Sequence, residues 1–361
     1  MSPGAAPSKR RALSKRALRD ALSAKAVMSA RHFGEAAERG QHQRVWGPAR
    51  RVEDAIARAG VQIHAIGIGR KMVANQYTNV PSVRVYVTHK LPTALLPTAA
   101  RIPDMIDGVP TDVIESPPAF LAAPALPVCS ALRGERQRPV QGGISGASEL
   151  INAGTLGALC RSTRAGEEGR RFVLGNNHTL ADLGAAPVGS AILQPSRRDF
   201  GTIDDRIASL SRFVPILENG TASNLVDAAI AELDATIEMQ SQICSIGTPS
   251  GINEAALDMV VQKHGRTSGP TLGVIDDPSV DIVIPLSRAN PQRVARFVRQ
   301  IRIRPAPAKP LFAQGGDSGA LVMSRSKGSA VGLLFACPDD GSFAYANPIS
   351  EVLKALEIAL V

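Results

Sequence analysis

The expected fold is decided by Gln314-Gly-Gly-Asp-Ser-Gly-Ala-Leu-Val322, in which a glycine-flanked serine leads directly into an apolar strand. Such a turn exposes the hydroxyl of Ser318, and its glycines let the amides of Gly316 and Ser318 converge on one point. A negatively charged oxygen at that point would be held by both N–H groups. The alternative is an ordinary Gly-Asp-Ser-Gly turn between strands, so a nucleophile at Ser318 requires partners elsewhere in the chain.

A histidine is presented upstream, where a strand-like run ends in a polar turn, Phe172-Val-Leu-Gly-Asn-Asn-His-Thr-Leu180. At neutral pH an imidazole can accept the proton of a serine hydroxyl and later return it to a leaving amine. The other five histidines, at positions 32, 42, 64, 89 and 264, have no comparable setting. This comparison favours His178 as the general base over the alternative of a surface or core histidine.

A catalytic triad also needs a buried carboxylate that orients the imidazole. Asp227 stands at the start of an apolar run of small residues, Asn224-Leu-Val-Asp-Ala-Ala-Ile-Ala231. Three other carboxylates compete, but their more polar surroundings favour solvated or capping roles. These competitors are Asp204, Asp205 and Asp234.

The chain order His178, Asp227, Ser318 is that of chymotrypsin rather than that of subtilisin or of α/β-hydrolases. With these motifs, residues 142–361 resemble the trypsin-like peptidase superfamily. Further shared stretches are Gly154-Thr-Leu-Gly157, Gly265-Arg-Thr-Ser-Gly269 and Val331-Gly-Leu-Leu-Phe335. From about Val61, the chain resembles bacterial intracellular members related to the plant narrow-leaf protein. That closer similarity lies in Ile66-Gly-Ile-Gly69, Tyr86-Val87 and Gly108-Val-Pro-Thr-Asp-Val-Ile-Glu115.

The resemblance implies a serine endopeptidase that forms an acyl-enzyme on Ser318 and needs no cofactor. The amides of Gly316 and Ser318 would then form its oxyanion hole. Many secreted relatives pair the Asp beside the serine with a newly cut N-terminus, but nothing in this sequence marks such a cut. Asp317 is therefore expected to make a local hydrogen bond or salt bridge instead.

The resemblance also places Phe312, six residues before the serine, at the base of the primary specificity pocket. Phe335 and Phe343 fall near its other walls, and no acid lies between Pro310 and Gln314. An Arg or Lys side chain of a substrate would find no counter-ion there. We predict a small or apolar residue before the cut, although a slip of one or two residues in the correspondence would leave the pocket undefined.

The predicted fold class is mainly β. Beyond Gly142, short apolar runs are separated about every ten residues by Gly, Pro, Asn or Asp, as in a sandwich or barrel. The resemblance makes this a chymotrypsin-like double β-barrel. Two helices are expected to interrupt it, one near Asn290–Gln300 and a closing amphipathic helix over Pro348–Leu360.

Four segments are expected along the chain. They are a basic helical arm over 1–50, a small α/β domain over 51–116, a Pro-rich extended linker over 117–141 and the protease domain over 142–361. The arm shows a weak apolar stripe at positions 13, 18, 22, 27 and 28. The α/β domain is expected to contain a helix over 52–59 and strands over 61–69, 82–88 and 104–115.

The net charge of +9 is concentrated at the N-terminus. Residues 1–51 hold 12 Lys or Arg against 3 Asp or Glu, whereas the remaining chain holds 29 of each sign. Any attraction to nucleic acid, anionic lipid or an acidic partner would therefore belong to the arm. A solvated arm with no partner is the alternative.

The cysteines lie far apart, at positions 129, 160, 244 and 337, without a Cys-x-x-Cys pair, and no metal site is expected. The sequence shows no secretory signal and no transmembrane stretch, so a cytoplasmic location is predicted. An organellar transit peptide is the second reading of the Arg-rich start. The sequence does not decide whether the chain forms a homo-oligomer.

The alternative to a peptidase is a pseudoprotease or regulatory scaffold that keeps the triad but has a closed pocket and binds partners through the basic arm. Phe312 and Phe335 favour that alternative. A nucleotide-binding enzyme is disfavoured, because Gly142-Gly-Ile-Ser-Gly146 lacks the Gly-Lys-Ser/Thr that holds phosphates.

Overall fold

The computed structural model of the chain describes residues 13–33, 63–73, 76–93, 96, 101–116, 120–121, 131–287, 289–307 and 309–361. The chain divides into two compact units, Met1–Ser116 and Pro117–Val361. The helix predicted over 52–59 and most of the arm lie outside the described residues.

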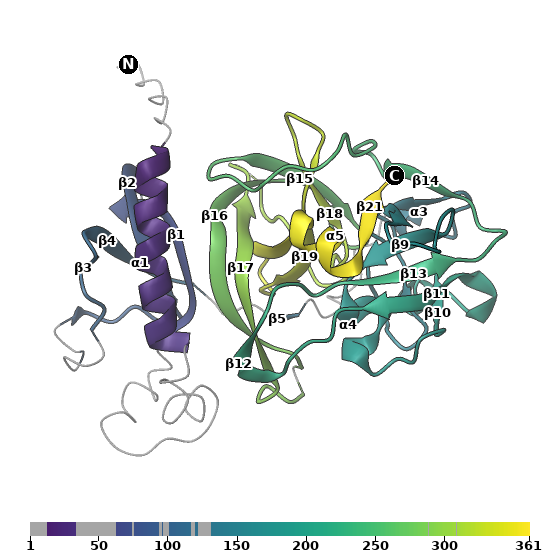
Figure 1. Cartoon of the computed structure of the whole chain (residues 1–361), viewed down its shortest axis with the longest axis horizontal. Coiled ribbons are helices and arrows are strands. Elements are labelled where there is room, and N and C mark those ends of the chain that lie inside the picture. The colour runs from purple at the N-terminus through teal and green to yellow at the C-terminus, as the bar shows by residue number, and fades with distance from the viewer. Residues whose placement is uncertain are drawn as a thin grey trace. The chain divides into compact units, whose positions relative to one another are not determined.

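The first unit contains one long helix and a small mixed sheet (Figure 1). Helix α1 packs against β1 and β2, which are antiparallel, and β2 is parallel to β4. The strand predicted over 104–115 is a hairpin instead, because the chain turns at Asp107 and Gly108, both with positive φ. The elements are α1 (Lys15–Phe33), β1 (Ile63–Val73), β2 (Gln76–Val87), β3 (Met105–Ile106) and β4 (Val109–Glu115).

The apolar stripe predicted for the arm is wrong in detail. Leu22 and Val27 are exposed, whereas the buried face of α1 contains Ala21, Ala24 and Met28. Small residues pack closely against the strands at helical spacing, so alanine rather than leucine marks the packed face.

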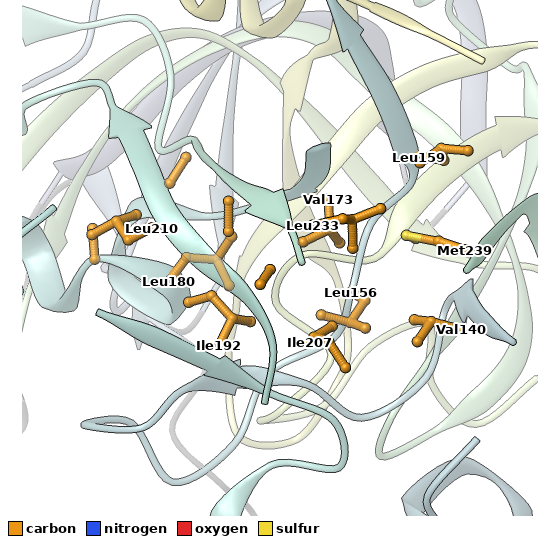
Figure 2. Close-up of a cluster of buried hydrophobic side chains, with 14 of the residues drawn as sticks. Val140, Leu156, Leu159, Val173, Leu180, Ile192, Ile207, Leu210, Leu233 and Met239 are labelled. Carbon is orange, nitrogen blue, oxygen red and sulfur yellow. The ribbon is translucent and has the colours of Figure 1, made fainter. Parts of the chain in front are cut away.

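In the second unit, a seven-stranded antiparallel sheet has the order β21-β8-β9-β13-β11-β10-β7. Its concave core is filled by aliphatic side chains that point toward one another, including Leu156, Val173, Ile192 and Ile207 (Figure 2). The strands are β7 (Ala147–Ser148), β8 (Leu159–Ser162), β9 (Arg171–Gly175), β10 (Ala191–Leu193), β11 (Arg206–Phe213), β13 (Ala229–Leu233) and β21 (Ile358–Leu360).

The remaining long strands of the second unit form a closed barrel. Along the path β17-β20-β19-β18-β15-β16 each strand pairs with the next, and β16 also pairs with β17, which completes a barrel. Strand β12 pairs with β17 outside this ring. The strands are β12 (Asn219–Asn224), β15 (Val260–Gly265), β16 (Gly269–Pro285), β17 (Val294–Pro305), β18 (Leu321–Ser324), β19 (Ala330–Cys337) and β20 (Ala344–Pro348).

A shared apolar cluster joins the sheet to the barrel and to helix α5. It contains Phe172 and Ile230 from the sheet, Leu321 and Leu333 from the barrel, and Val352 from α5, all buried. Smaller elements complete the unit: β5 (Phe120–Leu121), α3 (Ala131–Gly134), β6 (Val140–Gly142), α4 (Asn177–Leu180), β14 (Met239–Ile243), α5 (Ile349–Leu356) and three short 3₁₀ turns at 182–184, 197–199 and 203–205. The mainly β class predicted from the sequence is confirmed.

Two helix predictions need correction. Residues 290–300 do not form a helix, because β17 begins at Val294 and buries Ala295 and Phe297 at the two-residue period of a strand. The closing helix ends at Leu356, after which Glu357 adopts a positive φ and residues 358–360 pair with β8.

The end of the predicted linker also differs from an extended segment. Residues 131–134 are helical, and β6 pairs in parallel with β14 of the second unit.

Candidate active site

The pairing of two strands brings the predicted histidine and carboxylate together. Helix α4 follows β9 and carries His178, while Asp227 lies two residues before β13, and Gly175 of β9 pairs with Ala229 of β13. His178 Nδ1 lies 2.5 Å from Asp227 Oδ2, and the His178 backbone N–H donates to Asp227 Oδ1 at 3.2 Å. Both carboxylate oxygens are therefore bound by the same histidine.

The backbone of Asp227 is held by side chains that the sequence analysis missed. Asn176 Nδ2 donates to the Asp227 carbonyl at 2.7 Å, and the Asp227 N–H donates to Asn347 Oδ1 at 3.1 Å. Asn347 in turn donates to Gln300 Oε1 at 2.7 Å. Because Asn347 and Gln300 belong to the barrel, the backbone that carries the carboxylate is held from both halves of the unit.

Ser318 lies in the turn before β18 and is buried, with 1% of its surface exposed. Its Oγ donates to the Phe335 carbonyl at 3.3 Å, not to the imidazole. His178 Nε2 is buried and has no hydrogen-bond partner among the described residues. The imidazole nitrogen that a general base would use therefore makes no hydrogen bond to the described residues.

Residues 154 and 155 contact both the serine turn and the histidine turn. Thr155 N–H donates to the Ser318 carbonyl at 2.8 Å, and the neighbouring Gly154 faces the side chain of Thr179. The position that a Cβ would take on Gly319 is 3.8 Å from the Gly175 Cα. The serine turn therefore lies close to Gly175, the last residue of β9, which leads into the turn of His178.

The serine turn requires glycine at two positions. Gly316 and Gly319 both have φ of +97°, and a Cβ on Gly316 would lie 2.5 Å from Thr267 Oγ1. Among the described residues, neither the Gly316 nor the Ser318 N–H donates to a protein acceptor. Both amides are available for an oxyanion.

Asp317 is fully buried, and the expected local hydrogen bond is the one from the Gln314 N–H, whereas its salt bridge is made with a lysine distant in sequence. Lys263 Nζ of β15 lies 2.9 Å from its Oδ2, and both side chains are 0% exposed. Further hydrogen bonds come from the Ser268 hydroxyl at 2.5 Å and from backbone N–H groups of residues 267, 268 and 314. Burial opposes ionisation, but the Lys263 charge, the Ser268 hydroxyl and the Gln314 N–H together hold the pKa of Asp317 below its ordinary value.

Lys263 itself could not be identified from the sequence. Burial lowers the pKa of Lys263, and the charge of Asp317 opposes that shift. We regard the pair as ionised at neutral pH, because the carboxylate accepts hydrogen bonds from several donors besides the lysine. The buried Asp317 carboxylate thus has an internal ammonium group as its counter-ion.

Replacing Lys263 by methionine should destabilise the protein by about 3–5 kcal/mol, because it leaves the Asp317 carboxylate buried without its counter-ion. Equilibrium unfolding in urea at neutral pH would measure the loss. The matched control is Lys309→Met, which removes an exposed lysine and should change the stability by less than about 0.5 kcal/mol.

The loss of stability in Lys263→Met should depend on pH. The lowered pKa of Asp317 stabilises the fold above the ordinary carboxyl pKa, and this contribution is lost as the pH falls through the lowered value. The difference between wild type and Lys263→Met should therefore shrink in acid. Equal stabilities at neutral pH would contradict the structural role of the pair.

The three predicted pocket phenylalanines are deeply buried. Phe312 and Phe335 are 0% exposed and Phe343 is 2% exposed. The Phe335 ring lies 5.0 Å from that of Phe297, and Lys263 Nζ is 5.9 Å from the Phe312 ring centre. Phe312 belongs to the apolar core of the barrel, and the contribution of the three rings to a pocket stays a prediction.

Among the described residues, no group of three or more His, Cys, Asp or Glu side chains is arranged to hold a metal ion. Within the described residues, Cys160, Cys244 and Cys337 are not joined by disulfides, and Cys129 lies outside those residues. Within the same described ranges, no helix is long and apolar enough to cross a membrane.

Solved structures of serine proteases resemble the chain at low identity. Thermobifida fusca protease A is 17% identical, with 62% of this chain and 99% of that chain covered and a TM-score of 0.43. Cellulomonas bogoriensis chymotrypsin is 15% identical, with 62% and 98% covered and a TM-score of 0.43. A glutamic acid-specific serine protease is 15% identical, with 62% and 100% covered and a TM-score of 0.44. Neither a family model nor a curated protein sequence matches the chain.

These likenesses are too distant to assign residues, so the chemistry rests on the chain's own side chains. The second unit is thus a β unit made of a seven-stranded sheet and a closed barrel, and it carries a paired histidine and carboxylate and a glycine-flanked serine.

Proposed function

We propose that the chain is a serine endopeptidase whose triad is His178, Asp227 and Ser318. The observation that carries the proposal is the His178–Asp227 pair, whose Nε2 is unpaired among the described residues, together with a nearby serine turn in which the Gly316 and Ser318 amides are also unpaired. This arrangement supplies the nucleophile, the base and the oxyanion donors of acyl transfer.

In the proposed reaction, the Ser318 hydroxyl rotates from the Phe335 carbonyl to His178 Nε2 and attacks the carbonyl carbon of a peptide bond. His178 takes the hydroxyl proton, and Asp227 stabilises the resulting imidazolium. The N–H groups of Gly316 and Ser318 hold the oxyanion. The imidazolium then protonates the leaving amine, and water hydrolyses the acyl-enzyme by the same steps in reverse.

A peptide substrate is favoured by the pairing of β5 with β19. Phe120 pairs with Cys337 and Leu121 with Ala336, on the two residues that follow Phe335. The edge of β19 beside the nucleophile can therefore accept an extended chain as an antiparallel strand. The buried phenylalanines favour a small or apolar residue before the cut.

The proposal is tested by labelling the purified full chain with a fluorophosphonate probe and by profiling cleavage of a diverse peptide library. We expect labelling at Ser318 and cleavage after small or apolar residues, both absent in Ser318→Ala. A folded wild-type protein that is neither labelled nor active would overturn the proposal.

That negative result would favour the second candidate, a regulatory scaffold. The specific observation behind it is that the Ser318 hydroxyl donates to Phe335 instead of His178, while the predicted pocket residues are buried. In that case the basic residues of segment 1–50 would bind an acidic partner or nucleic acid. Binding that weakens as the salt concentration rises would support it.

Strand β5 should compete with substrate for the edge of β19. Proline at position 120 has no N–H and a fixed φ, so Phe120→Pro should weaken the pairing with Cys337. We expect kcat/KM for a peptide substrate to rise several-fold, because the free edge becomes more populated.

Phe120→Ala is the matched control, since it keeps the backbone N–H and should leave the pairing in place. Steady-state kinetics on one library peptide would compare the two variants with wild type. Competition by β5 is excluded if Phe120→Pro and Phe120→Ala have the same kcat/KM.

A further inference from the structure

Thr267 contacts the serine turn with both its side chain and its backbone. It lies in the turn between β15 and β16, and its hydroxyl donates to the Gly315 carbonyl at 2.7 Å. Its backbone N–H donates to Asp317 Oδ1 at 2.9 Å. Thr267 thereby links the buried carboxylate to the backbone that carries the oxyanion donors.

The direction of the hydrogen bond from the hydroxyl is fixed by a buried arginine. Arg266 Nη1 lies 3.3 Å from Thr267 Oγ1, and a guanidinium can only donate. The Thr267 proton is therefore left for the Gly315 carbonyl. Arg266 is itself held in place by Asp199, through contacts of 2.7 and 2.6 Å.

Holding the Gly315 carbonyl also orients the Gly316 N–H. In a trans peptide unit the C=O and the N–H point in opposite directions. The bond to Thr267 therefore directs the Gly316 N–H away from Thr267. Because glycine stands on both sides of this peptide unit, rotation of the unit meets little steric resistance, and the hydrogen bond opposes it.

The next peptide unit is held in a similar way from the other half of the unit. Thr155 Oγ1 donates to the Gly316 carbonyl at 2.8 Å and accepts the Arg266 N–H at 2.9 Å. Thr267 binds the carbonyl of the Gly315–Gly316 peptide unit, so the orientation of that unit depends on Thr267.

We propose that Thr267 is a positioning residue for the oxyanion hole: its hydroxyl keeps the Gly316 N–H directed at the reacting carbonyl. The inference rests on the proposed peptidase function. If the peptide unit rotated, the Gly315 oxygen would occupy the place of a hydrogen-bond donor and would repel the developing oxyanion.

Thr267→Val tests the proposal, because it removes the hydroxyl and keeps the shape of the side chain. Complete loss of one oxyanion donor costs roughly 10²–10³-fold in kcat. We expect a fall in kcat of at least about 10-fold, with KM changed by less than about 3-fold, since ground-state binding does not use the oxyanion donor. Thr267→Ser keeps the hydroxyl and should retain kcat within about 3-fold of wild type.

Inhibitor binding separates positioning from a merely structural role. A peptide aldehyde that adds to Ser318 forms an oxyanion, whereas the corresponding peptide alcohol cannot add and carries no negative oxygen. Thr267→Val should weaken binding of the aldehyde by the same factor as kcat/KM and leave the affinity for the alcohol unchanged. The urea unfolding midpoint of each variant is measured alongside, and Thr267→Ala replaces Thr267→Val if the latter does not fold.

Two results would overturn the inference: a hydroxyl-free variant with wild-type kcat, or equal losses in kcat for Thr267→Ser and Thr267→Val. Failure of the proposed function is recognised separately, since the wild type itself would then neither cleave peptides nor be labelled at Ser318.

Discussion

Alanine at Ser318 or at His178 should each lower kcat by about 10⁶-fold, and the double variant should be no slower than either single variant. In the proposed triad the nucleophile and its base act as a unit, so removing one of them makes the other useless. The residual rate would come from the oxyanion donors Gly316 and Ser318 and from substrate binding, both of which persist without the triad.

Exposed residues of the same types provide the controls for the two single variants and the double variant. His89 and Ser342 both lie at the surface, and their alanine variants should keep kcat within about 2-fold of wild type. Single-turnover measurements with a library peptide would determine the rates. Additive losses in the double variant would show that His178 and Ser318 do not act in one step.

Local sequence patterns were sufficient to select the residues of the proposed triad. A short apolar run adjoins each of the three residues Ser318, His178 and Asp227. Each residue could therefore be placed at a strand end from its own neighbours in the sequence. Their common location could then be inferred from the order along the chain. The pairing of β9 with β13 is what brings His178 and Asp227 together in space.

The residues that hold this site could not be predicted, because each acts across a long stretch of sequence. Asn347 binds a backbone group 120 residues away, at Asp227. Lys263 contacts Asp317 across 54 residues, and nothing in Val-Val-Gln-Lys marks the lysine as buried. A polar side chain inside a strand is ambiguous until the neighbouring strand is known.

The helix wrongly predicted near 290–300 has a similar origin. The apolar residues of this stretch fit the spacing of one helical face as well as they fit a strand. They are Val294, Phe297, Val298 and Ile301. Arg299 has a positive φ of 59°, which interrupts the strand and breaks the simple alternation in the sequence. Pairing of β17 with β16 and β20 decides in favour of the strand.

Asp227→Asn should lower kcat by about 10⁴-fold while leaving the fold and KM almost unchanged. The reason lies in the two contacts that the carboxylate makes. Oδ1 accepts the backbone N–H of His178 at 3.2 Å, so an asparagine must place its oxygen there. Its NH₂ group then faces His178 Nδ1, at the position that Oδ2 now occupies at 2.5 Å.

An amide that donates to Nδ1 forces the imidazole proton onto Nε2. In that tautomer Nε2 is a donor and cannot accept the Ser318 proton, although every heavy atom of the triad stays in place. A rise in kcat at alkaline pH, where hydroxide can take over the role of the base, would accompany the loss at neutral pH.

Asp234→Asn is the matched control, because Asp234 is a partly exposed carboxylate that pairs with Arg206 at 3.1 Å. Its kcat should remain within about 2-fold of wild type. If Asp227→Asn kept most of the wild-type kcat, or if Asp234→Asn lost as much, the carboxylate that orients the base would have to be sought elsewhere. Retained Ser318 labelling at a reduced rate in Asp227→Asn would distinguish a wrong tautomer from a disordered site, since only a formed oxyanion hole supports the slow reaction.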